Sequence, residues 1–249
     1  MALSDLLVPD YALPVIAGIL LAVLYPTSKQ VRAPEVKRGY RTLLVVTFVF
    51  GVLGAKLVAL MGDRLWPAVA LEDGWRTVVF GSGRSIVGGV LFGHVASEIA
   101  RPLIGYTAAP NDRLAVAVCF SVALGRVGCA LAGCCRGVPW DGPFALTYDD
   151  AIPRFPTPLL ELVFHVLLAC VFLWMERKRI LFGRLFSLYL VVYGVFRFAT
   201  EPLRVTPKPL VGFSVYQLFC VALVVVGVVG LLVRTYSSTW RTRLTEVPA

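Results

Sequence analysis

Long apolar stretches alternate with short polar connections along most of the chain. A helix needs about 20 predominantly apolar residues to cross the roughly 30 Å hydrocarbon layer of a bilayer. The pattern contains seven such stretches. It therefore predicts an all-α integral membrane protein with seven transmembrane helices, in which residues 1–249 form a single transmembrane domain. The predicted spans are residues 11–26, 43–62, 84–101, 113–132, 157–175, 181–200 and 212–233.

The charges between the spans predict their orientation. Lys and Arg concentrate in cytoplasmic loops, and fourteen of them lie on the side of the 27–42 and 176–184 loops, against seven on the other side. This bias predicts an N-terminus outside and a C-terminus in the cytoplasm. No basic residue precedes the first apolar run, so we expect a retained helix rather than a signal peptide. Residues 64–75 are too short and too charged to span, and predict an interfacial segment with Trp66 and Trp75 at headgroup level.

The composition agrees with a membrane protein. Hydrophobic residues make up 58% and charged residues 16% of the chain, whereas soluble domains have about 45–50% apolar and about 25% charged residues. A net charge of +9 could indicate nucleic-acid binding, but in a chain this apolar the basic residues mark cytoplasmic loops. We therefore expect the membrane as a partner, and no nucleic acid.

Several ionisable residues fall inside the predicted spans, where each costs roughly 2.5–3.5 kcal/mol on insertion scales. At about 1.5 Å per helical residue, Arg126 lies about 20 Å and Arg197 about 24 Å above the cytoplasmic start of their spans. Six such residues fall in the outer half of the membrane, while His94 and His165 lie deeper. The six are Lys56, Arg84, Arg126, Glu161, Arg197 and Glu201.

Four cations and two carboxylates leave spare positive charge in this group of six. An anionic ligand would balance it, and arginine is suited to bidentate binding of phosphate. The phosphate most available at that depth belongs to a lipid of the outer leaflet. Snorkelling or purely structural ion pairs are the alternative interpretation.

Spacing places several of these residues on common helix faces. Tyr193, Arg197, Glu201 and Arg204 are separated by four, four and three residues, so they share one face of a helix, which Pro202 is expected to end.

Two further patterns leave their interpretation open. In the third span, Gly88 and Gly89 allow close approach of either a helix or a ligand. His94 with Glu98, and Glu161 with His165, form i,i+4 pairs, which are more often structural than catalytic.

The cysteines allow several interpretations. Cys134 and Cys135 follow the fourth span and lie beside Arg136, and Cys129 lies three residues after Arg126. A low-pKa thiolate would suit chemistry, whereas small packing residues are the alternative. Adjacent cysteines form a disulfide only with strain, and zinc sites usually pair cysteines two to four residues apart with a second pair elsewhere, so we expect no metal site. The remaining cysteines are expected to be apolar filler within spans: Cys119, Cys170 and Cys220.

Four segments occur in the order found in a known family: "GRVG" at 125–128, "RFPTPLLE" at 154–161, "GRLFSLYLVVYGVFRFATEPLR" at 183–204 and "GFSVYQL" at 212–218. The chain resembles prolipoprotein diacylglyceryl transferases. The resemblance implies a multi-pass enzyme of the bacterial inner (cytoplasmic) membrane with seven spans. Such an enzyme moves the diacylglyceryl group of phosphatidylglycerol onto the cysteine thiol of a lipoprotein precursor, and glycerol phosphate leaves.

The resemblance also implies roles for particular residues. Arg126 matches the essential arginine of "GRxG" and Arg197 that of "YGxxR", while Glu201 and Arg204 match the acidic and basic positions that follow. We expect Arg126, Arg197 and Glu201 to be catalytic. The residues expected to bind substrate are Arg84, Gly88, Gly89, Glu161, Tyr193 and Arg204.

The chain departs from the family pattern on the acceptor side. Val87 stands where the family has a histidine, Cys129 where it has an asparagine, and "AGCCRG" at 132–137 replaces "NGExWG". An acceptor thiol needs a base or a lowered pKa. The substitute could be His94, Glu161 or Glu201, or a thiol from the group Cys129, Cys134 and Cys135.

Three functions remain open at this point. The first is diacylglyceryl transfer to a lipoprotein, and the second is a related enzyme that uses phosphatidylglycerol with a non-protein acceptor. The third is a non-catalytic lipid-binding protein or a transporter. A transporter would predict inverted repeats and broken helices at the midplane, and the sequence contains no evident repeat. We expect no cofactor.

Overall fold

A computed structural model describes residues 34–63, 83–106, 112–148 and 150–237, together with residues 14, 16–18 and 20. The predicted interfacial segment 64–75 and most of the first predicted span lie outside these residues. The chain forms two compact units. Unit 1 contains residues 1–26, 112–181 and 202–205, and unit 2 contains residues 27–111, 182–201 and 206–249.

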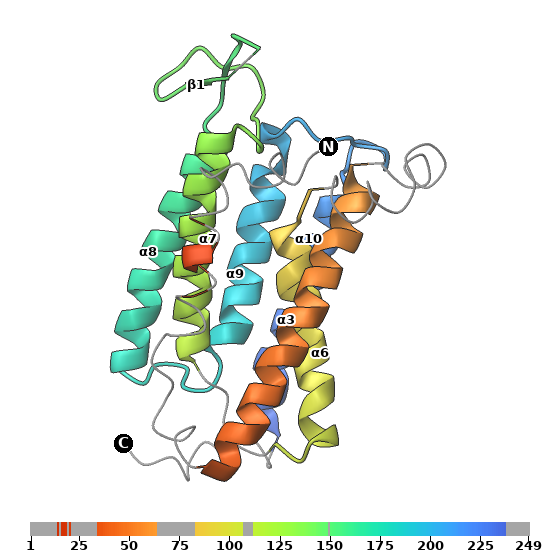
Figure 1. Cartoon of the computed structure of the whole chain (residues 1–249), viewed down its shortest axis with the longest axis vertical. Coiled ribbons are helices and arrows are strands. Elements are labelled where there is room, and N and C mark those ends of the chain that lie inside the picture. Colours follow the sequence, from red (N-terminus) through yellow and green to blue (C-terminus); the bar gives the residue numbers. More distant parts are fainter. Residues whose placement is uncertain are drawn as a thin grey trace. The chain divides into compact units, whose positions relative to one another are not determined.

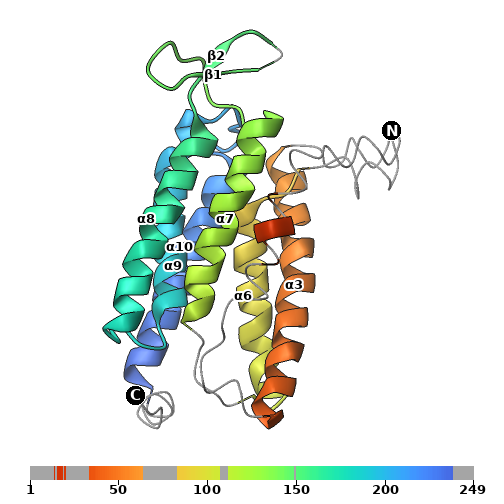
Figure 2. The same ribbon diagram turned by 60° about the vertical axis from the view of Figure 1, so that its left-hand side comes forward.

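Unit 1 is built on two long helices, α7 (Arg113–Ala132) and α8 (Thr157–Arg177), which run side by side (Figure 2). Helix α7 ends where Gly133 adopts a left-handed conformation with φ 63°, which glycine does without a Cβ penalty. Pro156 precedes α8 and Pro158 lies in its first turn, where proline costs no hydrogen bond.

A short antiparallel pair of strands extends beyond the ends of α7 and α8, formed by β1 (Leu146–Thr147) and β2 (Pro153–Arg154) (Figure 2). Leu146 pairs with Arg154, and Thr147 with Pro153. The prediction of an all-α chain missed this pair, because a strand of two residues is too short to show an alternation of apolar and polar positions.

In unit 2, α3 (Pro34–Gly62) packs along α6 (Ile86–Leu103) (Figure 1). Ser85 caps α6 by accepting a hydrogen bond from the Gly88 backbone N–H at 3.3 Å. Glycines allow the two helices to approach closely, since a Cβ on Gly93 would lie 2.9 Å from the backbone oxygen of Thr47. Small residues at such contacts are typical of helix packing in membranes.

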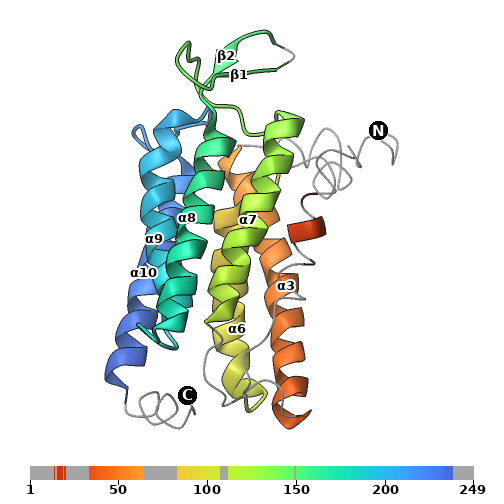
Figure 3. The same ribbon diagram turned by 90° about the vertical axis from the view of Figure 1, so that its left-hand side faces the viewer.

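The other helix pair of unit 2 is α9 (Leu185–Thr200) with α10 (Val215–Tyr236) (Figure 3). The short 3₁₀ helix η3 (Glu201–Leu203) follows α9 at Pro202. A capping box begins α10: Ser214 Oγ accepts from the Gln217 backbone N–H, and Gln217 Oε1 accepts from that of Ser214. These two bonds satisfy donors that a helix start leaves unpaired.

Among the described residues, four helices are long and apolar enough to cross a membrane: Arg38–Gly62, Arg113–Ala132, Thr157–Arg177 and Val215–Tyr236. They coincide with four of the predicted spans. Helices α6 and α9 overlap two more of the predicted spans, residues 84–101 and 181–200. Large apolar side chains such as Phe48, Leu53 and Val225 are exposed on these helices, as expected for surfaces that face lipid.

Candidate functional site

The centre of unit 1 is a buried ion pair between α7 and α8. Arg126 Nη2 lies 2.7 Å from Glu161 Oε2, and the two residues are 5% and 3% exposed. Arg204 Nη1 lies 3.5 Å from the same carboxylate oxygen. The structure therefore brings together three of the predicted site residues, with two guanidinium groups around one carboxylate.

Backbone contacts fix Arg204 in unit 1. Arg204 forms a bridge with Gly137, and the Val138 N–H donates to the Leu203 carbonyl at 3.0 Å. Arg204 thus lies in an extended segment beyond the end of α9. The predicted common helix face includes Tyr193 and Arg197, but it ends before Arg204 because Pro202 cannot continue the helix.

His165 also lies in this part of α8 and is fully buried. Its Nδ1 is 2.8 Å from the backbone carbonyl of Glu161. This backbone contact joins the i,i+4 pair expected from the sequence. The Glu161 carboxylate also contacts the two arginines.

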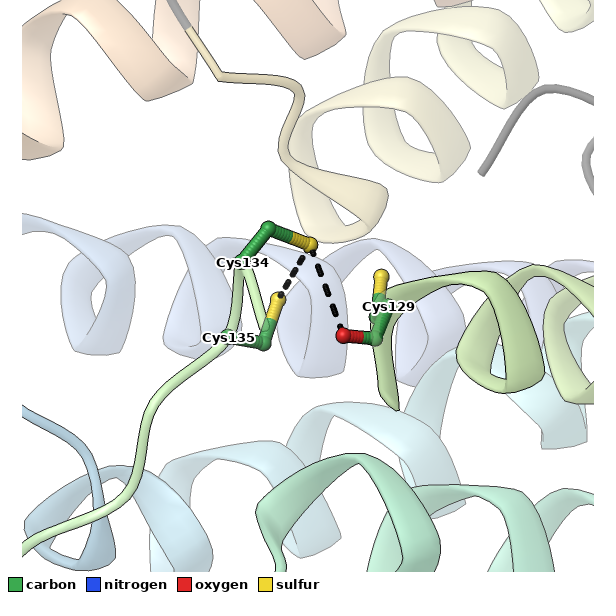
Figure 4. Close-up of side chains that lie close together, drawn as sticks. All are labelled: Cys129, Cys134 and Cys135. Atoms are coloured by element: carbon green, nitrogen blue, oxygen red, sulfur yellow. Dashed lines mark hydrogen bonds between the residues drawn. The ribbon is translucent and has the colours of Figure 1, made fainter. Parts of the chain in front are cut away.

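Three cysteines gather at the end of α7 (Figure 4). The Sγ atoms of Cys129, Cys134 and Cys135 all lie within 4.8 Å of one another. Arg126 Nη1 is 3.2 Å from the Sγ of Cys135 and 3.7 Å from that of Cys129. One guanidinium therefore faces a carboxylate with one nitrogen and a sulfur cluster with another.

This environment shifts the pKa values of the two adjacent thiols, Cys134 and Cys135, in opposite directions. Hydrogen bonds from Cys129 and Cys134, together with the charge of Arg126, hold the pKa of the Cys135 thiol well below its ordinary value. Hydrogen bonds to the other two cysteines, together with burial, raise the pKa of Cys134. Of the two alternatives left open by the sequence, thiolate or small packing residue, the thiolate is thus favoured at Cys135.

A second ionic group holds the loop that leads into α8. Asp150 Oδ2 accepts from Arg154 Nη2 at 2.6 Å and from Arg136 Nη1 at 3.2 Å. The hydrogen bond from Arg154 and the charges of Arg154 and Arg136 hold the pKa of Asp150 below its ordinary value. Arg154 also donates to the Gly137 carbonyl at 3.2 Å, which ties this loop to the segment after the cysteines.

Unit 2 holds two more of the predicted catalytic residues, Arg197 and Glu201. Arg197 and Glu201 form a buried ion pair at the end of α9. Glu201 Oε1 accepts from Thr206 Oγ1 and Ser214 Oγ, both at 2.8 Å. One turn earlier, Tyr193 is fully buried and stacks on Tyr189 with ring centroids 5.6 Å apart.

Three residues that the sequence predicts to bind substrate, Arg84, Gly88 and Gly89, lie just before or within the first turn of α6. Arg84 is exposed just before the first turn of α6. A Cβ on Gly88 would meet the backbone oxygen of Gly54, and one on Gly89 would lie 3.4 Å from that of Gly51. Close packing against α3 accounts for both glycines. Their role in binding substrate stays a prediction.

His94 is buried in unit 2 with its ring 5.1 Å from that of Phe186. It lines a cavity of about 310 Å³ together with Glu98 and Arg234. Glu98 Oε1 is 2.7 Å from Arg234 Nη2, so this carboxylate pairs with an arginine of α10.

Sequence reasoning missed several of these partners. Ser214 carries a local signal, because a serine followed three residues later by Gln217 predicts a capping box, although not the contact with Glu201. Asp150 and Thr206 carry no such signal, since their partners are set by loops.

The match to known proteins covers nearly the whole chain. The family model for prolipoprotein diacylglyceryl transferase matches residues 1–233. The chain belongs to the prolipoprotein diacylglyceryl transferase family. This family match contains every site residue predicted from the sequence and agrees with the resemblance of the four sequence segments.

Curated relatives support the family assignment. The chain is 28% identical to the phosphatidylglycerol–prolipoprotein diacylglyceryl transferase of Clostridium tetani, over 91% of this chain and 93% of the relative. It is 29% identical to the enzyme of that name from Rhodococcus jostii, over 87% of this chain and 67% of the relative. It is 23% identical to the enzyme of that name from Streptococcus uberis, over 90% of this chain and 90% of the relative.

Proposed function

We propose that the chain transfers the diacylglyceryl group of phosphatidylglycerol to the thiol of a prolipoprotein cysteine. The observation that carries the proposal is the family match over residues 1–233, and the relatives' names supply donor and acceptor. The buried Arg126 of the "GRVG" segment, paired with Glu161, supports the assignment of a phosphate-binding role.

The chemistry requires stabilisation of a leaving phosphate. The acceptor thiol loses its proton to water and its sulfur attacks the glyceryl carbon of phosphatidylglycerol, so that a C–S bond forms and the C–O bond to the phosphate breaks. The electron pair stays on the phosphate oxygen, and glycerol phosphate leaves. In this proposal Arg126 binds the phosphate and stabilises its growing charge, and the family resemblance implies a role in catalysis for Arg197. Glu161 and Glu201 orient these two guanidinium groups through the ion pairs.

The proposed setting is the bacterial cytoplasmic membrane. Seven spans with the N-terminus outside would place Arg126 in the outer half of the bilayer, at the depth of lipid phosphates. The positive-inside bias and the apolar helices support this arrangement.

A second candidate is transfer to a non-protein thiol or another acceptor. The departures at Val87 and in residues 132–137 favour it, because the resemblance implies that the family residues there serve the acceptor.

Complementation of a bacterial strain that lacks its own prolipoprotein diacylglyceryl transferase tests the proposal. The wild-type chain should restore the diacylglyceryl mass on a lipoprotein. Arg126→Ala and Arg197→Ala should each lower modification by about 100-fold or more, relative to the amount of folded protein in the membrane. Arg177→Ala, at an exposed arginine of α8, is the control. Full modification by either site variant would refute the role assigned to that arginine.

A further inference from the structure

The three clustered cysteines form a built site, because local structure directs them toward one another. Cys129 lies in the last turn of α7, and the left-handed Gly133 turns the chain so that Cys134 and Cys135 return toward it (Figure 4). Cys134 Sγ lies 3.9 Å from both the Cys129 carbonyl oxygen and the Cys135 Sγ. Thr157 Oγ1 fixes this segment by donating to the Cys135 carbonyl at 2.6 Å.

These distances match the requirements of zinc. Zinc binds thiolate sulfur at about 2.3 Å in tetrahedral geometry, which places two ligand sulfurs about 3.8 Å apart. The Cys134 and Cys135 sulfurs are 3.9 Å apart, and all three sulfurs lie within 4.8 Å of one another. Small side-chain rotations would therefore bring the three sulfurs around one ion. Three protein ligands leave a fourth position open, as in catalytic zinc sites.

The surrounding charges suit a zinc–thiolate group. Three thiolates and one Zn²⁺ carry a net charge of −1. Arg126 and Arg204 together exceed Glu161 by one positive charge, and Arg126 Nη1 lies 3.2 Å from the Cys135 sulfur. The guanidinium can donate N–H hydrogen bonds to the sulfur ligands. The spacing of these cysteines differs from the usual pairs, which is why the sequence alone predicted no metal site.

We propose that Cys129, Cys134 and Cys135 bind Zn²⁺ and that the open fourth position takes the acceptor thiol. This inference rests on the proposed transferase function and offers a means to activate the acceptor in place of the family histidine, whose position is occupied by Val87. A thiol that coordinates zinc is deprotonated, and its proton passes to water. The zinc-bound sulfur then attacks the glyceryl carbon, and the C–O bond to the phosphate breaks. The thioether product leaves the zinc, and glycerol phosphate carries away the electron pair.

The closeness of the cysteine cluster to Arg126 supports this mechanism. The same guanidinium that is assigned to the phosphate lies against the sulfur cluster. A thiol bound at the fourth position is thus held next to the group that leaves, which lowers the entropic cost of the reaction.

Zinc binding is tested first, on the full-length protein purified in detergent with its thiols reduced. We expect one Zn²⁺ per chain by elemental analysis, and S-to-metal charge-transfer bands after replacement by Co²⁺. Cys129→Ser, Cys134→Ser and Cys135→Ser should each weaken Zn²⁺ binding by more than the 10- to 100-fold that loss of an outer-shell partner costs. Cys170→Ser, at an exposed cysteine of α8, should bind as the wild type does. Absence of bound metal in the wild type would overturn the inference.

The open position is tested with two peptides that differ only in the acceptor residue. A cysteine peptide should shift the Co²⁺ spectrum, and the matching serine peptide should not. Removal of metal with a chelator should abolish diacylglyceryl transfer, and Zn²⁺ should restore it. Full transfer by the metal-free wild type would overturn the inference and leave the transferase function standing. A shifted spectrum without any transfer would support the zinc site and refute the proposed function.

Discussion

At the scale of residues, each unit holds a buried arginine that is paired with a carboxylate. Arg126 with Glu161, and Arg197 with Glu201, are almost completely buried. Removal of one partner from such a pair is strongly destabilising, because it leaves an uncompensated charge. Variants at these positions therefore need a measurement of folding beside each measurement of activity.

Asp150 gives a pH-dependent prediction at this scale. Its pKa lies below the ordinary 3.8 because Arg154 and Arg136 bind the carboxylate. The interaction therefore stabilises the fold above about pH 4 and is lost as the pH falls through the lowered pKa. We expect Asp150→Asn to lower the thermal unfolding midpoint at neutral pH and to flatten its fall below pH 4. Asp141→Asn, at an exposed residue of the same loop, is the control. An identical profile for Asp150→Asn and the wild type would contradict the assignment.

The sequence identified the charged residues that lie within apolar stretches, but it did not predict which residues they pair with. The cost of charge within a span identifies Arg126 and Glu161 from the sequence alone, and the structure pairs them. The pairing of Glu98 with Arg234 crosses 136 positions, so an argument from helical spacing could not find it. The sulfur cluster depends on the turn at Gly133, whose direction the sequence does not specify.

At the scale of elements, glycine positions decide how closely helices pack. A Cβ on Gly88 would meet the backbone of Gly54 and the side chain of Val58, whereas a Cβ on Gly125 of α7 would meet no described atom within 4 Å. Apolar periodicity predicted helices α3, α6, α7, α8, α9 and α10. It could not predict β1 and β2, which depend on backbone pairing within the 133–156 connection.

Matched glycine substitutions test the contact between α3 and α6. Gly88→Ala should destabilise the protein by about 1–3 kcal/mol, because the backbone of α3 must move. Gly125→Ala should be neutral or stabilising by up to about 1 kcal/mol, because alanine favours a helix interior. Denaturant or thermal unfolding in detergent measures both. Equal stability of the two variants would contradict the packing described for Gly88.

At the scale of the whole molecule, the account requires a chain that crosses the membrane seven times. Apolar helices and the family match support a membrane enzyme. The predicted orientation, with the N-terminus outside, rests on the distribution of Lys and Arg along the chain and on the positive-inside rule.

Reporter fusions test this orientation. A reporter joined after Ala249 should show the activity of a cytoplasmic protein, and one inserted in the 133–156 connection should behave as external. The reason is that fourteen basic residues lie on the side of the C-terminus against seven on the other. An external signal from the reporter after Ala249 would overturn the count of spans.

The most direct test of the central claim is transfer by the purified protein. Phosphatidylglycerol vesicles and a cysteine-containing acceptor peptide are the substrates, and mass spectrometry detects the thioether. The account predicts one diacylglyceryl thioether per glycerol phosphate released, and a rate about 100-fold or more lower for Arg126→Lys, because lysine cannot bind phosphate in the bidentate way of arginine. No thioether from the wild type, or equal rates for the wild type and Arg126→Lys, would contradict it.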